Sequence, residues 1–236
     1  MLIRLFATLS ALLASTALLL FAGFLQNWTP KGIDTPGIFP GDWMLNALLL
    51  LAFCVGHSLL ARPGIKQKLY GGLNAKLSRS AYNLVAAAQL GLLMYFWTPE
   101  PSTLWQLRSP AGVAATYALF GFAWVLLLVA TAAIDPLHMF GLRQVFARCV
   151  AEPPFSMRGP YRLVRHPIQT GLILAFWATP HMTVGHAVLA ASLTAYSVLA
   201  TLGLEERDLG AELGQDYEHY KRRVPALLPS LPGRRK

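Results

Sequence analysis

Four long segments without a charged residue dominate the first 134 residues of this chain. Each consists almost entirely of apolar and small side chains and contains no Asp, Glu, Lys or Arg. A helix needs about 20 apolar residues to cross the hydrocarbon core of a bilayer. With 55% hydrophobic and 13% charged residues, the chain is also too apolar for an ordinary soluble domain. The sequence therefore predicts membrane-spanning helices at residues 5–25, 43–61, 81–97 and 111–134.

A fifth uncharged stretch, residues 167–204, contains a break near its middle. Thr179-Pro180-His181 and Gly185 disfavour one continuous helix there. The stretch is too short for two full-length crossings, so it predicts a hairpin of two short helices. We therefore expect an all-α integral membrane protein with about six transmembrane helices.

The positive charges predict the orientation of these helices. Of the 20 Lys and Arg residues, only Lys31 and Arg108 fall in loops on one side of the membrane, and the other 18 fall on the opposite side. The positive-inside rule places the richer side and both termini in the cytoplasm, as expected for a protein of the bacterial inner (cytoplasmic) membrane. The first segment could instead be a cleavable signal. Its apolar run is longer than a usual signal core and no cleavage site follows it, which favours a retained anchor.

The same distribution accounts for the formal net charge of +9. It indicates membrane lipid of an anionic leaflet as the partner and gives no support to nucleic-acid binding. Cys54 and Cys149 are too few and too poorly placed for a disulfide framework. The spacing of Cys, His and acidic residues is not typical of a metal site, so no metal is expected.

Ionisable residues lie at both ends of the predicted hairpin. Arg165-His166-Pro167 stands at its start and Glu205-Glu206 at its end. Charges beside hydrocarbon are costly, so they pair with each other or bind a polar ligand. This arrangement predicts a binding site, with a purely structural salt-bridge cluster as the alternative.

The segment after residue 204 predicts an amphipathic helix on the cytoplasmic side, continuous or nearly continuous with the last span. Its apolar positions recur at steps of 4, 4, 3 and 4 residues, which makes one stripe of a helix that ends before Pro225. The stripe consists of Leu209, Leu213, Tyr217, Tyr220 and Val224.

These motifs, together with Gly171 and Pro225, resemble the isoprenylcysteine carboxyl methyltransferase superfamily of membrane enzymes. Residues 140–144, 175–180 and 205–209 are in addition similar to the bacterial methanethiol S-methyltransferases within it. The resemblance covers residues 134–229 well. It implies a transfer of methyl from S-adenosyl-L-methionine to a small thiol, methanethiol, giving dimethyl sulfide. It also divides the chain into a four-span membrane region, 1–133, and a cofactor-binding region, 134–236.

The resemblance implies where the cofactor binds. Pro167 suits the first turn of a helix, which places His166 near its N-cap, where backbone N–H groups suit the cofactor's carboxylate. Glu205 or Glu206, preferably Glu206, suits the ribose hydroxyls or the ammonium group. Gln169 stands where the superfamily often has Tyr, and Gly171 could equally serve close helix packing. The predicted cofactor-binding residues are Tyr161, Arg165, His166, Pro167, Gln169, Gly171, Glu205, Glu206 and Tyr217.

The expected chemistry needs a thiolate, and a nearby cation lowers the pKa of a thiol. The candidate cations are Arg143 and the group Arg158, Arg162 and Arg165, because arginine stays charged in a partly buried place. His57 is the one His, Asp, Glu, Lys or Arg residue within the first four spans. It could act as a general base, or its imidazole could simply be hydrogen-bonded within the helix packing. Asp135, near His138, is a further polar candidate, with helix capping as the alternative.

Other functions remain open from the sequence. The same chemistry could act on a prenylcysteine carboxylate or a lipid amine. A transporter or non-catalytic membrane subunit is a different class, but the spans show no relay of ionisable residues. A membrane reductase using a nicotinamide cofactor is a further option.

Overall fold

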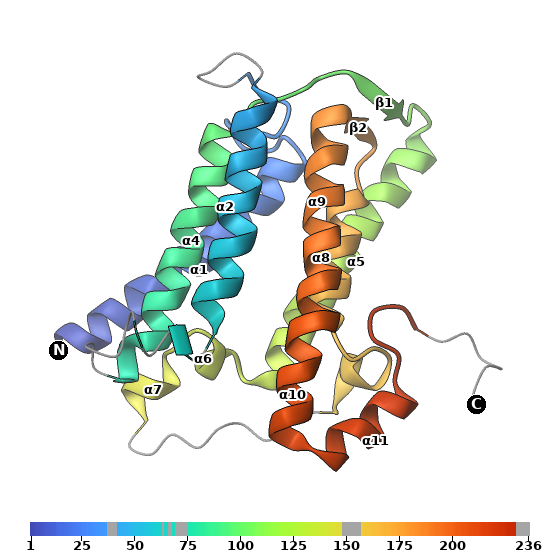
Figure 1. Ribbon diagram of the computed structural model, residues 1–236. Helices are drawn as coiled ribbons and strands as arrows, with labels where there is room; N and C mark the ends of the chain where they lie inside the picture. Colours follow the sequence, from blue (N-terminus) through green and yellow to red (C-terminus); the bar gives the residue numbers. More distant parts are fainter. Residues whose placement is uncertain (37–41, 63, 66–67, 69–74, 148–156, 230–236) are drawn as a thin grey trace. The chain divides into compact units, whose positions relative to one another are not determined.

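The described part of the chain is mainly helical, as its apolar segments predict (Figure 1). The structure is a computed structural model that describes residues 1–36, 42–62, 64–65, 68, 75–147 and 157–229. The chain divides into two compact units. The first consists of Met1–Leu104, Asp135–Pro153 and Met182–Leu189, and the second of Trp105–Ile134, Pro154–His181 and Ala190–Lys236.

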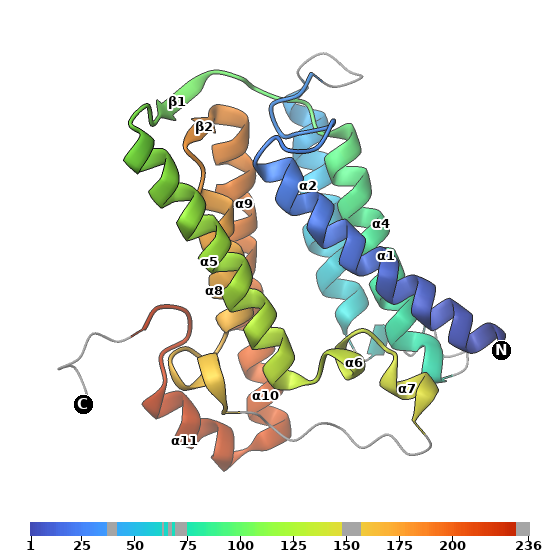
Figure 2. The same ribbon diagram turned by 180° about the vertical axis from the view of Figure 1, so that it is seen from behind.

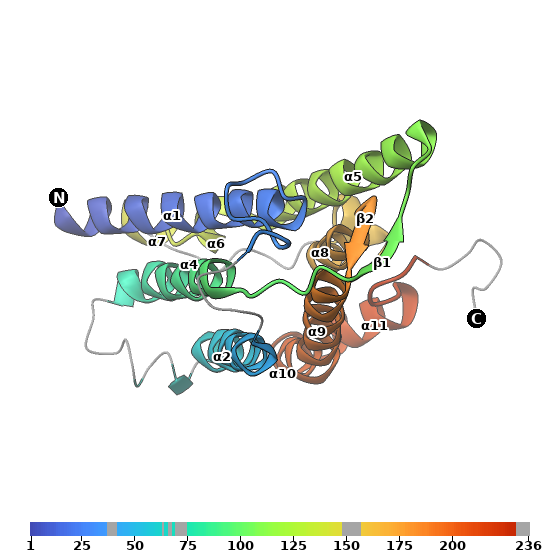
Figure 3. The same cartoon turned by 90° about the horizontal axis from the view of Figure 1, so that it is seen from above.

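Helix α4 (Ser78–Phe96) is the central element of the first unit. It packs against both α1 (Leu2–Leu25) and α2 (Trp43–Ala61), and Figures 1 and 3 show the three helices side by side. Asp42 fixes the start of α2, because its carboxylate accepts hydrogen bonds from the first backbone N–H groups of that helix.

Three short helices of the first unit lie near the start of α4. They are η1 (Ala75–Leu77), α6 (Pro136–Met139) and α7 (Arg143–Phe146), and α7 contacts both η1 and α1. Gly141, between α6 and α7, has a φ of 80°. A Cβ atom there would lie 2.6 Å from Ser80 Oγ, so only glycine allows this loop to approach α4 so closely.

Helices α5 (Pro110–Ile134) and α8 (Pro167–Trp177) form the main packing of the second unit (Figure 2). Gly171 lies at their contact. A Cβ atom at this position would come within 2.8 Å of the Ala123 carbonyl oxygen and 3.3 Å of the Leu127 backbone nitrogen. The close packing considered for Gly171 from the sequence is therefore present.

The predicted break in the middle of the hairpin is confirmed. Helix α8 ends at Trp177 and α9 (Val184–Ala200) begins seven positions later. Between them lies the strand β2 (His181–Thr183), which pairs with β1 (Thr103–Gln106) in a two-stranded sheet.

The second arm of the hairpin is longer than predicted. Helix α9 continues through one turn of π-helix, η3 (Thr201–Glu205), into α10 (Glu206–Leu213). The expectation of two short arms is right for α8, which has 11 residues, and wrong for this helix. The predicted continuity between the last span and the amphipathic segment is confirmed, because the helix continues through Glu205 and Glu206.

The stretch predicted as one amphipathic helix is divided in two. Gly214, with φ 57° and ψ −129°, separates α10 from α11 (Gln215–Arg223). The second helix ends before Pro225 as predicted, because proline cannot continue it. The five stripe positions are buried or half-buried, and Tyr217 is fully buried.

Four helices are long and apolar enough to cross a membrane: Leu2–Leu25, Trp43–Ala61, Pro110–Ile134 and Val184–Leu213. Many of their leucines are exposed, as suits contact with lipid. Helix α8 is apolar but shorter. The chain is therefore a helical integral membrane protein.

We predict that Gly171→Ala destabilises the second unit by about 1–3 kcal/mol, because the new methyl group would force α8 away from α5. Thermal unfolding of the detergent-solubilised protein, followed by circular dichroism, measures this effect. Gly121→Ala on α5 is the matched control, since a Cβ atom there meets nothing within 4 Å. Equal melting temperatures for the two variants would contradict the close packing.

Candidate functional site

A buried ion pair joins the start of α8 to the start of α10. Arg165 Nε donates to Glu206 Oε1 at 2.9 Å, and Nη2 of the same guanidinium also contacts this oxygen. The side chains of Arg165 and Glu206 are only 8% and 5% exposed. The sequence prediction that the two ends of the hairpin meet is thus realised within the second unit.

Glu206 has two further partners. His166 Nε2 lies 3.2 Å from Glu206 Oε1, and Lys221 Nζ lies 3.3 Å from Glu206 Oε2. Both carboxylate oxygens are therefore engaged by cationic or N–H groups. Lys221 was not singled out from the sequence, although it stands one helical turn after Tyr217 on the same side of α11.

The chain after α11 is bound to the start of α8 by its backbone. The Arg165 and His166 N–H groups donate to the carbonyls of Pro225 and Ala226 at 2.8 and 3.0 Å. The guanidinium of Arg165 completes the junction, because Nη1 donates to the carbonyl of Lys221 at 3.1 Å and also to that of Val224. Pro225 makes this possible by ending α11.

His166 is the N-cap residue of α8, as predicted, with Pro167 in the first turn. Its side chain is 3% exposed. Burial lowers the pKa of His166 because it disfavours the imidazolium, and the hydrogen bond with Glu206 opposes this only in part. The imidazole is therefore neutral near neutral pH, and the positive charges around Glu206 are those of Arg165 and Lys221.

Glu205 differs from its neighbour in exposure. Its side chain is 46% exposed, and its Oε2 accepts a hydrogen bond from Gln169 Nε2 at 3.3 Å. The same oxygen lies 3.6 Å from His166 Nδ1. Glu205 thus presents a carboxylate that a ligand can reach, whereas Glu206 is enclosed.

Three buried tyrosines, Tyr161, Tyr217 and Tyr220, lie next to this cluster. The Tyr220 hydroxyl donates to the Tyr161 carbonyl at 2.6 Å, and the rings of Tyr217 and Tyr220 lie 6.1 Å apart. All three side chains are buried. Burial is the main cause that raises the pKa of Tyr217 and of Tyr220 to about 12, so both stay neutral phenols.

The residues predicted to act on the thiol belong to the first unit. Asp135 Oδ2 lies 2.8 Å from Arg143 Nε, and Asp135 also caps α6 by accepting from the His138 backbone N–H at 3.1 Å. The capping considered for Asp135 is therefore present together with an ion pair. Asp135 has a φ of 97°, a strained conformation for a residue with a side chain.

His57 lies on α2 and contacts α4. Its Nε2 is 3.1 Å from the Tyr82 hydroxyl, and its ring stacks on Phe53. No pattern in the sequence pointed to Tyr82 as the partner of His57. Among the residues that the structure describes, no group of three or more His, Cys, Asp or Glu side chains could hold a metal ion.

The amino-acid sequence of the chain is similar to those of known proteins. Residues 45–231 match the family described as NnrU protein. The chain is 41% identical to methanethiol S-methyltransferase 2 of Bradyrhizobium diazoefficiens, over 99% of this chain and 92% of that protein. It is 42% identical to the methanethiol S-methyltransferase of Mycobacterium tuberculosis, over 79% of this chain and 78% of that protein.

More distant similarity extends to Nurim of Bos taurus, at 30% identity over 78% of this chain and 73% of that protein. No solved structure matches the chain. The chain belongs to the NnrU family. The family resemblance inferred from its motifs is confirmed.

We predict that Glu206→Gln lowers the stability of the protein by about 3–5 kcal/mol, because it leaves the buried Arg165 without its counter-ion. Thermal unfolding in detergent measures the loss. Glu212→Gln, an exposed carboxylate on the same helix α10, is the control and should melt like the unchanged protein. A melting temperature for Glu206→Gln equal to that of the control would show that the ion pair contributes nothing.

Proposed function

We propose that this chain is an integral membrane methyltransferase that uses S-adenosyl-L-methionine to convert methanethiol to dimethyl sulfide. The observation that carries the proposal is the 41% identity to a methanethiol S-methyltransferase over 99% of this chain. The match extends over both the segments that form the membrane helices and the segments that carry the polar cluster. Similarity to the methanethiol S-methyltransferases of other bacteria supports the same assignment.

The polar cluster suits a methyl donor of this kind. S-adenosyl-L-methionine supplies a methyl group on a positively charged sulfur and carries a carboxylate, an ammonium group and ribose hydroxyls. Glu205, the reachable carboxylate, binds the ammonium group or the ribose hydroxyls, and Gln169 orients it through their hydrogen bond. The first turn of α8 offers backbone N–H groups to the carboxylate.

The remaining residues of the cluster hold this surface in place. Glu206 is saturated by Arg165, His166 and Lys221, so it positions α10 and α11 and does not contact the donor. The preference for Glu206 as the direct contact, drawn from the sequence, is therefore replaced by Glu205. Tyr161 and Tyr217 pack behind the cluster, Pro167 starts α8 and Gly171 sets the distance between α8 and α5.

Arg143 stabilises the thiolate form of the acceptor. A free thiol has a pKa of about 8.5, and a neighbouring cation lowers this pKa. Asp135 fixes the guanidinium through Nε and leaves the other guanidinium N–H groups of Arg143 to face the sulfur. His57, paired with Tyr82, accepts the thiol proton. S-adenosyl-L-methionine, when bound, would supply the methyl group: its sulfonium S–CH3 bond would break as the thiolate sulfur forms the new one, and the neutral thioether S-adenosyl-L-homocysteine would leave. The reaction neutralises one positive and one negative charge, so exclusion of water would favour it.

The proposal includes the number of membrane crossings and the side of the membrane on which the termini lie. Six crossings, with both termini on the cytoplasmic side of a bacterial inner membrane, follow from the predicted partition of Lys and Arg. Helices α4 and α8 then join, as crossings, the four helices that are long and apolar enough to span a membrane. Residues 134–236 form the cofactor-binding region, with α10 and α11 at the cytoplasmic surface, and residues 1–133 form the four-span region.

We predict that cells producing this protein release dimethyl sulfide when they are given methanethiol, as measured by headspace gas chromatography. Arg143→Lys should lose much of this rate, because lysine gives up its charge more readily in a partly buried place and lacks the fork of N–H donors. Arg207→Lys, an exposed arginine on α10, is the matched control. Methylation of a prenylated cysteine in place of methanethiol would overturn the acceptor and leave the methyltransferase assignment standing.

We also predict that Glu205→Gln weakens binding of S-adenosyl-L-methionine about tenfold or more, because a neutral amide loses a charge-assisted hydrogen bond. Isothermal titration calorimetry of the purified protein gives the affinity directly. Glu212→Gln removes the same charge from an exposed position of α10 and should bind like the unchanged protein. Unaltered affinity in Glu205→Gln would exclude Glu205 from the donor site.

A further inference from the structure

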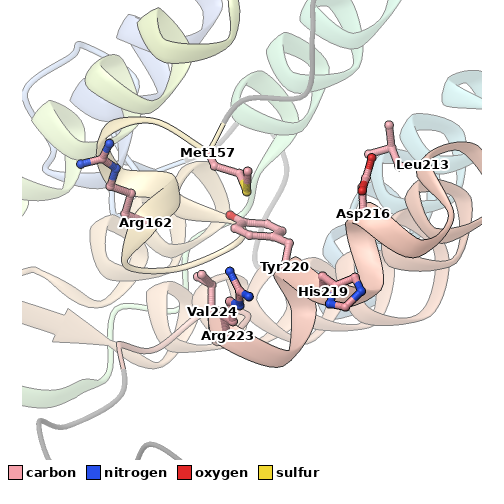
Figure 4. Close-up of a pocket in the computed structure, with 8 residues that line it drawn as sticks. All are labelled: Met157, Arg162, Leu213, Asp216, His219, Tyr220, Arg223 and Val224. Atoms are coloured by element: carbon pink, nitrogen blue, oxygen red, sulfur yellow. The ribbon is translucent and has the colours of Figure 1, made fainter.

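A pocket in the second unit lies beside the side chain of Tyr220 (Figure 4). It has a volume of about 770 Å³ and is open to the outside. The segment before α8 forms one side of it, and α11 with the end of α10 forms the other. Its lining residues are Met157, Arg162, Leu213, Asp216, His219, Tyr220, Arg223 and Val224.

The pocket is lined mainly by basic side chains. Arg162 and Arg223 line it together with His219, against the single carboxylate of Asp216. Within the described part of the chain, neither arginine forms an ion pair with a carboxylate. Figure 4 shows Asp216 at the far end of the pocket from Arg162. The two guanidinium groups are thus available to an anion.

The surroundings of the pocket are those of a membrane surface. Arg162 lies just before the apolar helix α8, and Arg223 just before the segment whose carbonyls bind the start of that helix. Leu163, beside Arg162, is 63% exposed, and Leu228, which follows the same segment, is 76% exposed. Exposed leucines next to arginines that pair with no carboxylate of the described residues are typical of a surface that touches both acyl chains and headgroups.

We propose that this pocket binds the phosphate headgroup of an anionic phospholipid, in particular phosphatidylglycerol. The planar guanidinium groups of Arg162 and Arg223 bind phosphate oxygens with paired hydrogen bonds. Asp216 and His219, exposed on α11, bind the glycerol hydroxyls. The leucines contact the first carbons of the acyl chains. A zwitterionic headgroup would bring a positive charge to the arginines and binds less well.

Helix α11 links this pocket to the ion-pair cluster. Asp216, His219, Tyr220 and Arg223 line the pocket at steps of 3, 1 and 3 residues, whereas Tyr217 and Lys221 of the same helix face Glu206 and Arg165. A lipid bound in the pocket therefore holds α11 against α8. Lipid binding should stabilise the second unit whether or not the methyl donor is present.

Native mass spectrometry of the full-length protein in neutral detergent, with added phosphatidylglycerol or phosphatidylcholine, tests the proposal. We expect bound phosphatidylglycerol on the unchanged protein and a loss of affinity of about tenfold or more in the double variant Arg162→Gln, Arg223→Gln. Arg222→Gln is the matched control, since Arg222 is the next residue of α11 and does not line the pocket. It should bind like the unchanged protein.

The other outcomes overturn the proposal. Equal binding of both lipids, or equal losses in the control and the double variant, would show only general attraction to basic residues. Competition by millimolar inorganic phosphate as strong as that by phosphatidylglycerol would assign the pocket to soluble phosphates.

If the double variant does not fold, Arg223→Lys, which keeps the charge and removes the paired hydrogen bonds, must show a weaker preference for phosphatidylglycerol. Because the readout is lipid binding, failure of the methyltransferase assignment would not affect it.

Discussion

The buried ion pair between Arg165 and Glu206 is the interaction on which the second unit depends. Either charge alone in this place would be strongly unfavourable, so the start of α8 and the start of α10 must come together. The same guanidinium binds carbonyls at the end of α11, and the chain beyond is hydrogen-bonded to the start of α8. One arginine therefore fixes three segments that are far apart in the sequence.

This arrangement separates the groups that hold the site from those that can bind. Glu206, Arg165 and Lys221 satisfy one another and leave little capacity for a ligand. Glu205, one residue earlier, is half-exposed and oriented by Gln169. Methyl transfer needs alignment more than covalent assistance from the protein, and a rigid support for the groups that hold the donor provides it.

Sequence reasoning predicted the helices, the break after α8 and the meeting of the hairpin ends, because length, hydropathy and the cost of charge are local properties. It could not distinguish Glu205 from Glu206, because two adjacent residues of one type differ only through the tertiary contacts that bury one of them. It missed the helix break at Gly214, since the apolar stripe continues across it. It also missed Tyr82, whose partnership with His57 arises only from the packing of α2 on α4.

The most direct test of the account supplies the purified protein with methanethiol and S-adenosyl-L-methionine that carries a trideuterated methyl group. Mass spectrometry of the volatile product then reports where its methyl group came from. The account predicts dimethyl sulfide with one trideuterated methyl group, formed only in the presence of the protein. Unlabelled dimethyl sulfide, or no dimethyl sulfide from protein that is folded and binds the donor, would contradict it.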